Sequence, residues 1–194
     1  GCVPPVIKMP KPMPDIVKEY KSFKFDSTNF EYLKTGIHVV NGDFITIMAK
    51  GATRGTYWGM TPPQNLMLKI GETGPIFFLF PSPSSNTLQV KETGEILIRT
   101  TLWRLTSAFH GYFAVDIIVW KKEDPILIAD FLQVMSLKDP DNEVLKSFAK
   151  DFKNRKEMIL AEKKATEEVE QAKKAIATLE RKEVSPIKEL DKEK

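Results

Sequence analysis

The sequence predicts a mainly β fold: a β-sandwich followed by a short helix and a long charged C-terminal helix. Between about residues 23 and 120, short apolar runs rich in Val, Ile, Phe and Thr alternate with turn residues at fairly even spacing. Two Asp-Pro pairs, at residues 124–125 and 139–140, are typical helix starts. After residue 152 the aromatic residues cease, and just over half of the residues from 151 to 194 are charged. So many short strands need two packed sheets to bury their apolar faces.

Composition limits the function classes. A length of 194 residues fits one domain with an appendage. The 29 Lys plus Arg residues barely exceed the 26 Asp plus Glu residues, so a nucleic-acid partner is not expected. No run approaches the ~20 apolar residues that a membrane-spanning helix needs. A single cysteine excludes an intrachain disulfide framework and a cysteine-based zinc site.

The N-terminal segment, predicted to be a tether over residues 1–20, has five prolines among its first fourteen residues. Cys2 followed by such a segment and then a folded domain resembles a mature bacterial lipoprotein, so Cys2 is predicted to carry a lipid anchor. An incidental thiol is the alternative. By resemblance to enteric lipoproteins, Val3 after the cysteine favours the outer membrane over retention in the inner membrane.

The β-sandwich is predicted over residues 21–122. Phe44, Thr46 and Met48 alternate with Ile45, Ile47 and Ala49, so both faces of this strand are fairly apolar and the strand lies inside the packed layers. Turn residues between the apolar runs set the strand limits. Eight strands are predicted, over residues 22–25, 36–40, 44–49, 66–70, 76–80, 87–90, 95–101 and 111–120.

Two helices are predicted to follow the sandwich. The first covers 123–138 and places Leu127, Phe131 and Met135, beside Ile128 and Leu132, on one broad apolar face that packs on the sandwich. A buried strand over 126–135 is the alternative. The second covers 139–184, with a frayed tail over 185–194. Its early residues Leu145, Phe148 and Phe152 are expected to contact the sandwich.

The later part of the second helix carries a thin apolar stripe. Its members recur at steps of 3, 4, 4, 3, 4 and 3 residues, which average 3.5, the period of a coiled-coil seam. The seam predicts a partner helix, in a second copy or in another protein. Because three of the seven members are alanine, a long solvated helix with i to i+4 charge pairs is the alternative. The seam residues are Met158, Ala161, Ala165, Val169, Ala172, Ile176 and Leu179.

Catalytic and metal-binding patterns are absent from the sequence. The chain has two histidines, His38 and His110, and contains neither an HExxH motif nor a glycine-rich phosphate loop, so no enzymatic activity is expected. A hydrolase or isomerase using His110 with Asp116 or Glu95 is the remaining enzymatic alternative. The polar residues at 139–143 are interpreted as helix caps rather than a calcium loop.

Aromatic residues near predicted loops form a candidate ligand or partner surface. Flat rings at loops can stack on a sugar or anchor a protein partner, although core packing is the default alternative. The residues assigned to this candidate loop surface are Tyr57, Trp58, Trp103, Arg104, Phe109 and His110.

The β region resembles a known family. Residues 42–51 (GDFITIMAKG), 66–74 (LMLKIGETG), 94–98 (GEILI) and 111–117 (GYFAVDI) are similar to successive strands of the galactophilic bacterial lectin family of the PA-IL type, over about residues 21–120. The resemblance implies a lectin-like, galactose-binding-domain-like sandwich. It also implies calcium-mediated galactose binding, but the positions that should carry the ligands fall on Thr101, Leu105, Ala108 and Phe109. Hydrocarbon side chains cannot coordinate calcium, so no metal or other cofactor is expected.

These features together predict a non-enzymatic, lipoprotein-type binding or scaffold subunit of a bacterial envelope or surface assembly, located in the periplasm or at the cell surface and anchored to the outer membrane. It would contact the membrane through the lipid anchor only, and bind protein partners or a second copy through the C-terminal helix. The alternative is a calcium-independent carbohydrate-binding module that recognises cell-surface or extracellular glycans.

Overall fold

The computed structural model describes residues 4–26, 31–54, 66–78, 86–100 and 110–184 of the chain. The chain divides into two compact units, residues 1–153 and residues 154–194. The first unit holds all the described strands and the α1 helix (Pro125–Lys138). The α2 helix (Glu143–Val184) begins in the first unit and supplies the described part of the second.

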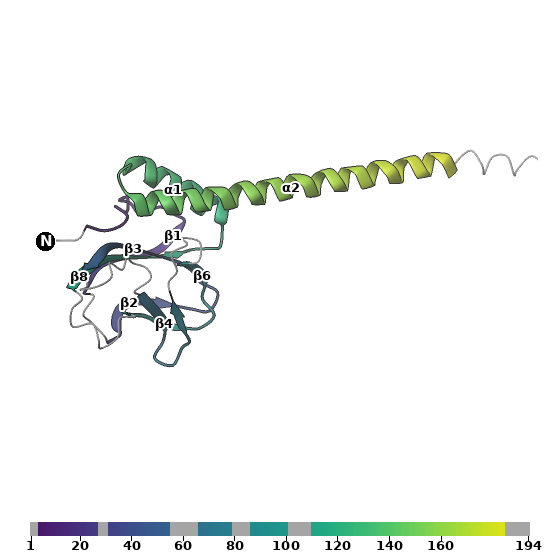
Figure 1. Cartoon of the computed structure of the whole chain (residues 1–194). Helices are drawn as coiled ribbons and strands as arrows, with labels where there is room; N and C mark the ends of the chain where they lie inside the picture. Colours follow the sequence, from purple (N-terminus) through teal and green to yellow (C-terminus); the bar gives the residue numbers. More distant parts are fainter. Residues whose placement is uncertain (1–3, 27–30, 55–65, 79–85, 101–109, 185–194) are drawn as a thin grey trace, which may run out of the picture. The chain divides into compact units, whose positions relative to one another are not determined.

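The first unit contains two four-stranded antiparallel sheets (Figure 1). One sheet has the order β1 (Val17–Asp26), β8 (His110–Trp120), β3 (Phe44–Arg54), β6 (Thr87–Gln89). The other has the order β2 (Leu33–Val39), β7 (Gly94–Thr100), β4 (Leu66–Ile70), β5 (Ile76–Phe78). The predicted mainly β sandwich with a short and a long helix is therefore confirmed, and each of the eight predicted strands matches an observed one.

The main core lies between the two sheets. Because successive side chains of a strand point to opposite faces, Ile45, Ile47 and Ala49 of β3 lie in this core. Alternate residues of β8, such as Phe113 and Val115, lie there too. Gly51 lets β3 approach β8 closely: its φ is 130°, and a Cβ there would lie 2.4 Å from the carbonyl oxygen of Tyr112. The inner faces of both sheets thus form one continuous apolar layer.

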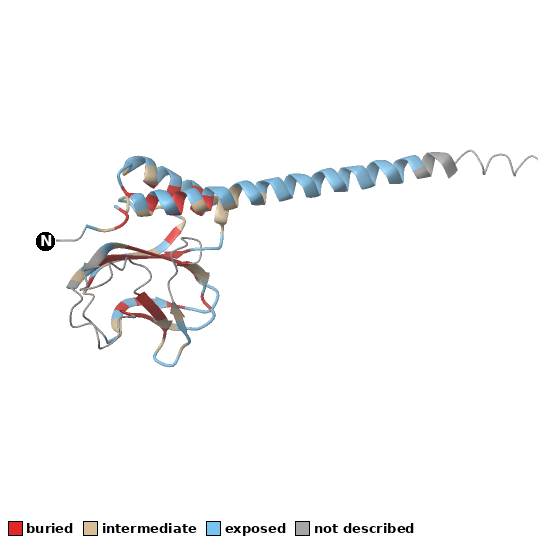
Figure 2. Ribbon diagram, viewed as in Figure 1, coloured by how far each residue is buried: buried red, intermediate tan, exposed pale blue. Residues whose placement is uncertain are grey.

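A second core covers the other face of the β1–β8–β3–β6 sheet. Met48 of β3 and Ile118 and Trp120 of β8 are buried there against α1 and the first turns of α2. The Trp120 ring meets Phe131 edge to face at 5.7 Å, and its indole N–H donates to the Thr46 hydroxyl at 2.8 Å. As Figure 2 shows, the buried residues of α2 lie in its first turns. Strand β3 is therefore apolar on both faces because it is covered on both.

The α1 helix begins as predicted, and α2 begins later than predicted. Asp124 caps α1: its carboxylate accepts the Leu127 N–H at 3.1 Å, and this bond lowers the pKa of Asp124. The second Asp-Pro pair does not start a helix, because Asp139 is the C-cap residue of α1. The cap of α2 is Asn142, whose side-chain oxygen accepts the Leu145 N–H at 3.1 Å.

Most of the predicted apolar face of α1 is buried. Ile128, Leu132 and Met135 are buried as expected, with Ala129 beside them, and Phe131 is partly buried, whereas Leu127 at the edge of the predicted face is 43% exposed. The alternative of a buried strand over 126–135 is wrong, because this segment is helical throughout. In α2, the predicted contacts of Leu145, Phe148 and Phe152 with the sandwich are confirmed: all three are buried in the second core.

The predicted tether over residues 1–20 is only partly an irregular segment, and it is not free. Strand β1 begins at Val17, inside the predicted tether. Val6 and Ile7 are fully buried in the second core, against the helices and the sheet. Proline content predicts a segment without regular secondary structure before Val17, but it does not show that two apolar side chains within it are packed.

Candidate interaction sites

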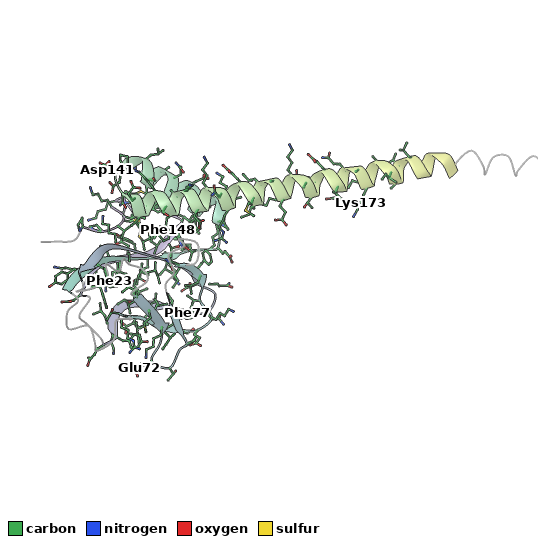
Figure 3. All side chains as sticks on the ribbon, in the orientation of Figure 1. Phe23, Glu72, Phe77, Asp141, Phe148 and Lys173 are labelled. Carbon is green, nitrogen blue, oxygen red and sulfur yellow. The ribbon has the colours of Figure 1, made fainter. Side chains whose placement is uncertain are left out.

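The seam on α2 is an exposed candidate interaction surface. All seven predicted seam residues lie within α2, and all are exposed. Met158 is 72% exposed and Leu179 is 62% exposed. Figure 3 shows side chains standing out on all sides of this part of α2, with Lys173 labelled among them. An exposed apolar stripe on a highly charged helix is typical of a surface that binds another helix. The partner helix itself stays a prediction.

Charge pairs run along the same helix. Lys164 lies 3.9 Å from Glu168, and Lys174 lies 2.9 Å from Glu170, each at the i to i+4 spacing. Such pairs add a few tenths of a kcal/mol each to a solvated helix. They support helix formation without a partner, so the solvated-helix alternative explains the charges but not the apolar stripe.

The candidate loop surface falls mostly outside the described residues: Tyr57, Trp58, Trp103, Arg104 and Phe109 are not described, and His110 is placed as the first residue of β8. The strand residues that flank these two ranges pair with one another. Arg54 pairs with His110, and Leu66 pairs with Thr100. Residues 55–65 and 101–109 therefore both attach at the same end of the sandwich.

The buried N-terminal segment is held by long-range hydrogen bonds. The Ile7 N–H donates to the Asp116 carboxylate at 2.7 Å, and the Asn142 side-chain amide donates to the Val6 carbonyl at 2.6 Å. The Tyr20 hydroxyl lies 2.7 Å from the Ile7 carbonyl oxygen and 2.9 Å from Asp116, and shares its one proton between these two acceptors. Strands β1 and β8 and the cap of α2 thus fix the backbone of two consecutive residues. Cys2, the predicted anchor, lies outside the described residues.

Asp116 is the centre of this arrangement. It is fully buried on β8, on the face toward the helices, and accepts hydrogen bonds from Ile7, from the Ser22 hydroxyl at 2.7 Å and from the Tyr20 hydroxyl at 2.9 Å. Burial, followed by the nearby Asp116 carboxylate, raises the pKa of Tyr20 well above its ordinary value. Several donors satisfy the carboxylate, as a fully buried acidic group requires.

The enzymatic alternative finds no support at these residues. His110 and Asp116 lie six residues apart on one strand, a Cα separation of about 20 Å, so they do not form a catalytic pair. Glu95 accepts the Gly36 N–H at 2.7 Å and lies opposite His38, which is exposed. Asp116 accepts hydrogen bonds from Ile7, Ser22 and Tyr20.

Two of the polar residues between α1 and α2 act as caps: Asp139 is the C-cap of α1 and Asn142 caps the start of α2. Asn142 is held by the Asp139 carboxylate at 3.1 Å while it caps α2. Asp139, Asp141 and Glu143 line a surface hollow together with Lys50 of β3. Among the residues that the structure describes, no group of three or more His, Cys, Asp or Glu side chains is placed to hold a metal ion.

Sequence reasoning missed the role of Ile7, Asn142 and Asp116. The one available signal was a single aspartate inside the apolar run of β8, which suggests a buried acidic group in need of donors. Its main-chain donor at Ile7 is 109 residues away, so no local pattern could identify it.

Comparison with solved structures gives a distant likeness to a lectin domain. No protein-family model matches the chain, and neither does any curated protein. Among solved structures, the N-terminal domain of EclA, described as a PllA-like lectin, matches with 21% sequence identity and a TM-score of 0.42, covering 50% of this chain and 94% of that chain. This distant likeness is to a lectin domain, as the sequence resemblance implied, and it concerns the fold alone.

None of the described helices combines the length and the apolar character needed to span a membrane.

Proposed function

We propose that this chain is a non-enzymatic scaffold subunit of a bacterial envelope or surface assembly, held at a membrane by a lipid on Cys2 and joined to its partner through α2. The observation that carries the proposal is the exposed seam. Seven apolar residues recur along one stripe of a helix whose other positions are mostly charged or polar. Burial of this stripe by another helix would remove apolar surface from water, which is the main driving force for protein association.

The hydrogen-bonded N-terminal segment supports a membrane-proximal position for the first unit. Val6 and Ile7 are fixed in the second core. Val6 is four residues along the chain from Cys2, so their Cα atoms lie at most about 14 Å apart. A lipid on Cys2 would therefore hold the helix-covered side of the sandwich close to the bilayer, rather than on a long flexible tether.

The anchor is tested on native protein from its own cells. We expect mass spectrometry to find Cys2 acylated, and cell fractionation to place the protein with membranes and a Cys2→Ala variant in the soluble fraction. The variant's fold should be unchanged, because the residues held by hydrogen bonds begin at Val6. A free thiol on Cys2 in the native protein would contradict the anchor.

The alternative function is calcium-independent carbohydrate binding. It is favoured by the pairing of Arg54 with His110 and of Leu66 with Thr100, which attaches the ranges that carry Trp58 and Trp103 to one end of the sandwich. Aromatic residues such as Trp58 and Trp103 are of the type that stacks on a sugar.

Glycan-array measurements distinguish this alternative. Binding that persists in a chelator and is lost in a Trp58→Ala, Trp103→Ala double variant would support carbohydrate recognition. We expect no such binding from the scaffold subunit. A Tyr112→Ala variant serves as the control, because Tyr112 is 44% exposed on β8 and is not among the candidate loop residues.

A further inference from the structure

The seam occupies a narrow part of the α2 surface. At 100° per residue, its seven members fall within an arc of about 80°. The large members are exposed: Val169 is 54% and Ile176 is 56% exposed. A stripe of this width is typical of the contact between two helices, which leaves the remaining surface in water.

The charges beside the seam are not arranged equally on its two sides. Glu162 and Lys173 lie on one side, eleven residues apart. Glu157, Lys164 and Glu168 lie on the other side. Charges at these flanking positions set the orientation of paired helices.

Two-fold symmetry determines which sides meet. In an antiparallel pair of identical helices, each side faces the same side of the partner, whereas in a parallel pair opposite sides meet. An antiparallel pair can therefore place Glu162 of each helix beside Lys173 of the other. A parallel pair instead places Glu162 near Glu157, which is repulsive, and Lys173 near Glu168, which is attractive.

The Glu162–Lys173 pairing also fixes the register, with the midpoint between residues 167 and 168. In this register Met158 lies next to Ile176 of the partner, and Val169 lies next to the small Ala165. The Glu168 residues meet near the midpoint, but each already pairs with Lys164 of its own helix at 3.9 Å. The second side carries one net negative charge per helix, but Glu157 lies opposite the uncharged Thr178 of the partner in this register, so the two attractive pairs on the first side decide the orientation.

We propose that residues 154–179 of α2 bind the same residues of a second copy of this chain in an antiparallel orientation. This inference rests on the proposed function and specifies its partner as a second copy. Two Glu162–Lys173 pairs and the seven seam residues of each helix form the interface.

Disulfide trapping in the full chain tests the orientation. In a Cys2→Ser background, Met158→Cys and Ile176→Cys variants are purified separately, mixed and oxidised, and the linked peptides are identified by mass spectrometry. We expect the mixed disulfide between the two variants to dominate. Like positions lie about 27 Å apart in this arrangement, too far for a disulfide.

The other outcomes overturn the inference in different ways. If disulfides form between like positions, the two helices are parallel; the antiparallel inference fails and the proposed function stands. If no disulfide forms but the chain binds a different protein through the seam, the second-copy inference fails and the proposed function again stands. If the chains form no disulfide and the seam binds no partner of any kind, both proposals fail.

A charge exchange gives an independent readout. Glu162→Lys and Lys173→Glu each convert two attractive pairs into repulsive ones, so each is expected to raise the dimer dissociation constant by on the order of tenfold. The double variant restores both pairs and should return to within about twofold of the wild type. Tighter binding by Glu162→Lys alone would indicate the parallel arrangement, because that change removes the repulsion with Glu157.

Discussion

Replacement of Asp116 by alanine is expected to lower the free energy of unfolding of the 1–153 unit by about 3 kcal/mol. The carboxylate accepts the main-chain N–H of Ile7 and the hydroxyls of Ser22 and Tyr20, in a fully buried position. The variant leaves Ile7 and Ser22 without these bonds, and an unsatisfied buried donor costs ~1–3 kcal/mol. Urea denaturation followed by circular dichroism measures the change.

The same substitution should release the N-terminal segment before the sandwich unfolds. Val6 and Ile7 have hydrogen-bonded partners in β1, β8 and the cap of α2. Loss of one of these bonds favours local opening, so trypsin should cleave after the exposed Lys8 faster in Asp116→Ala than in the wild type. Unchanged stability together with unchanged cleavage at Lys8 would show that Asp116 does not hold the segment.

A Tyr20→Phe variant provides the matched control at the same site. It keeps the ring and Asp116 but removes the hydroxyl that reaches Ile7 and Asp116. Because the folded state raises the pKa of Tyr20 above its ordinary value of 10.0, the stabilisation from this group is complete below pH 10 and is lost as the pH rises further. Between pH 9 and pH 11 the wild type should therefore lose more stability than Tyr20→Phe.

The second large effect is expected at the seam. Val169→Asp combined with Ile176→Asp places two charges on the apolar stripe of each helix, where pairing would bury them. We expect the dissociation constant for self-association to rise by on the order of 100-fold or more. Light scattering after size-exclusion chromatography measures the loss.

A variant with the same change of charge controls for this result. Leu160→Asp with Ala177→Asp also introduces two aspartates at apolar, exposed positions of α2, but these positions lie more than about 100° from the centre of the seam. This variant should associate like the wild type. Equal loss in both variants would mean that charge or helix stability, rather than the seam, controls association.

The sandwich could be predicted from the sequence because its signals are local. Alternation in β3 and β8 and the turn residues between strands placed all eight strands, with 66–70 predicted at its observed limits. Strand β1 extends further than predicted because its first residues, Val17 to Lys21, are mostly polar. The α2 helix begins later than predicted because its cap is the residue whose side chain accepts a main-chain N–H of the first turn. That residue is Asn142 rather than Asp139.

The missed features depend on distant partners. The burial of Ile7 requires Asp116 and Tyr20, which belong to strands far along the chain. Leu127 has the right spacing for the buried face of α1, but the tilt of a helix on a sheet decides which edge of an apolar face is covered. In contrast, the seam could be found by periodicity alone because it lies on one continuous helix.

Sedimentation equilibrium of the full chain is the most direct test of the seam as an interaction surface. We expect the wild type and the Leu160→Asp, Ala177→Asp variant to reach the mass of a dimer as concentration rises, while Val169→Asp, Ile176→Asp remains at the mass of one chain. A single-chain mass for the wild type throughout the range, or the same association in all three proteins, would contradict the account.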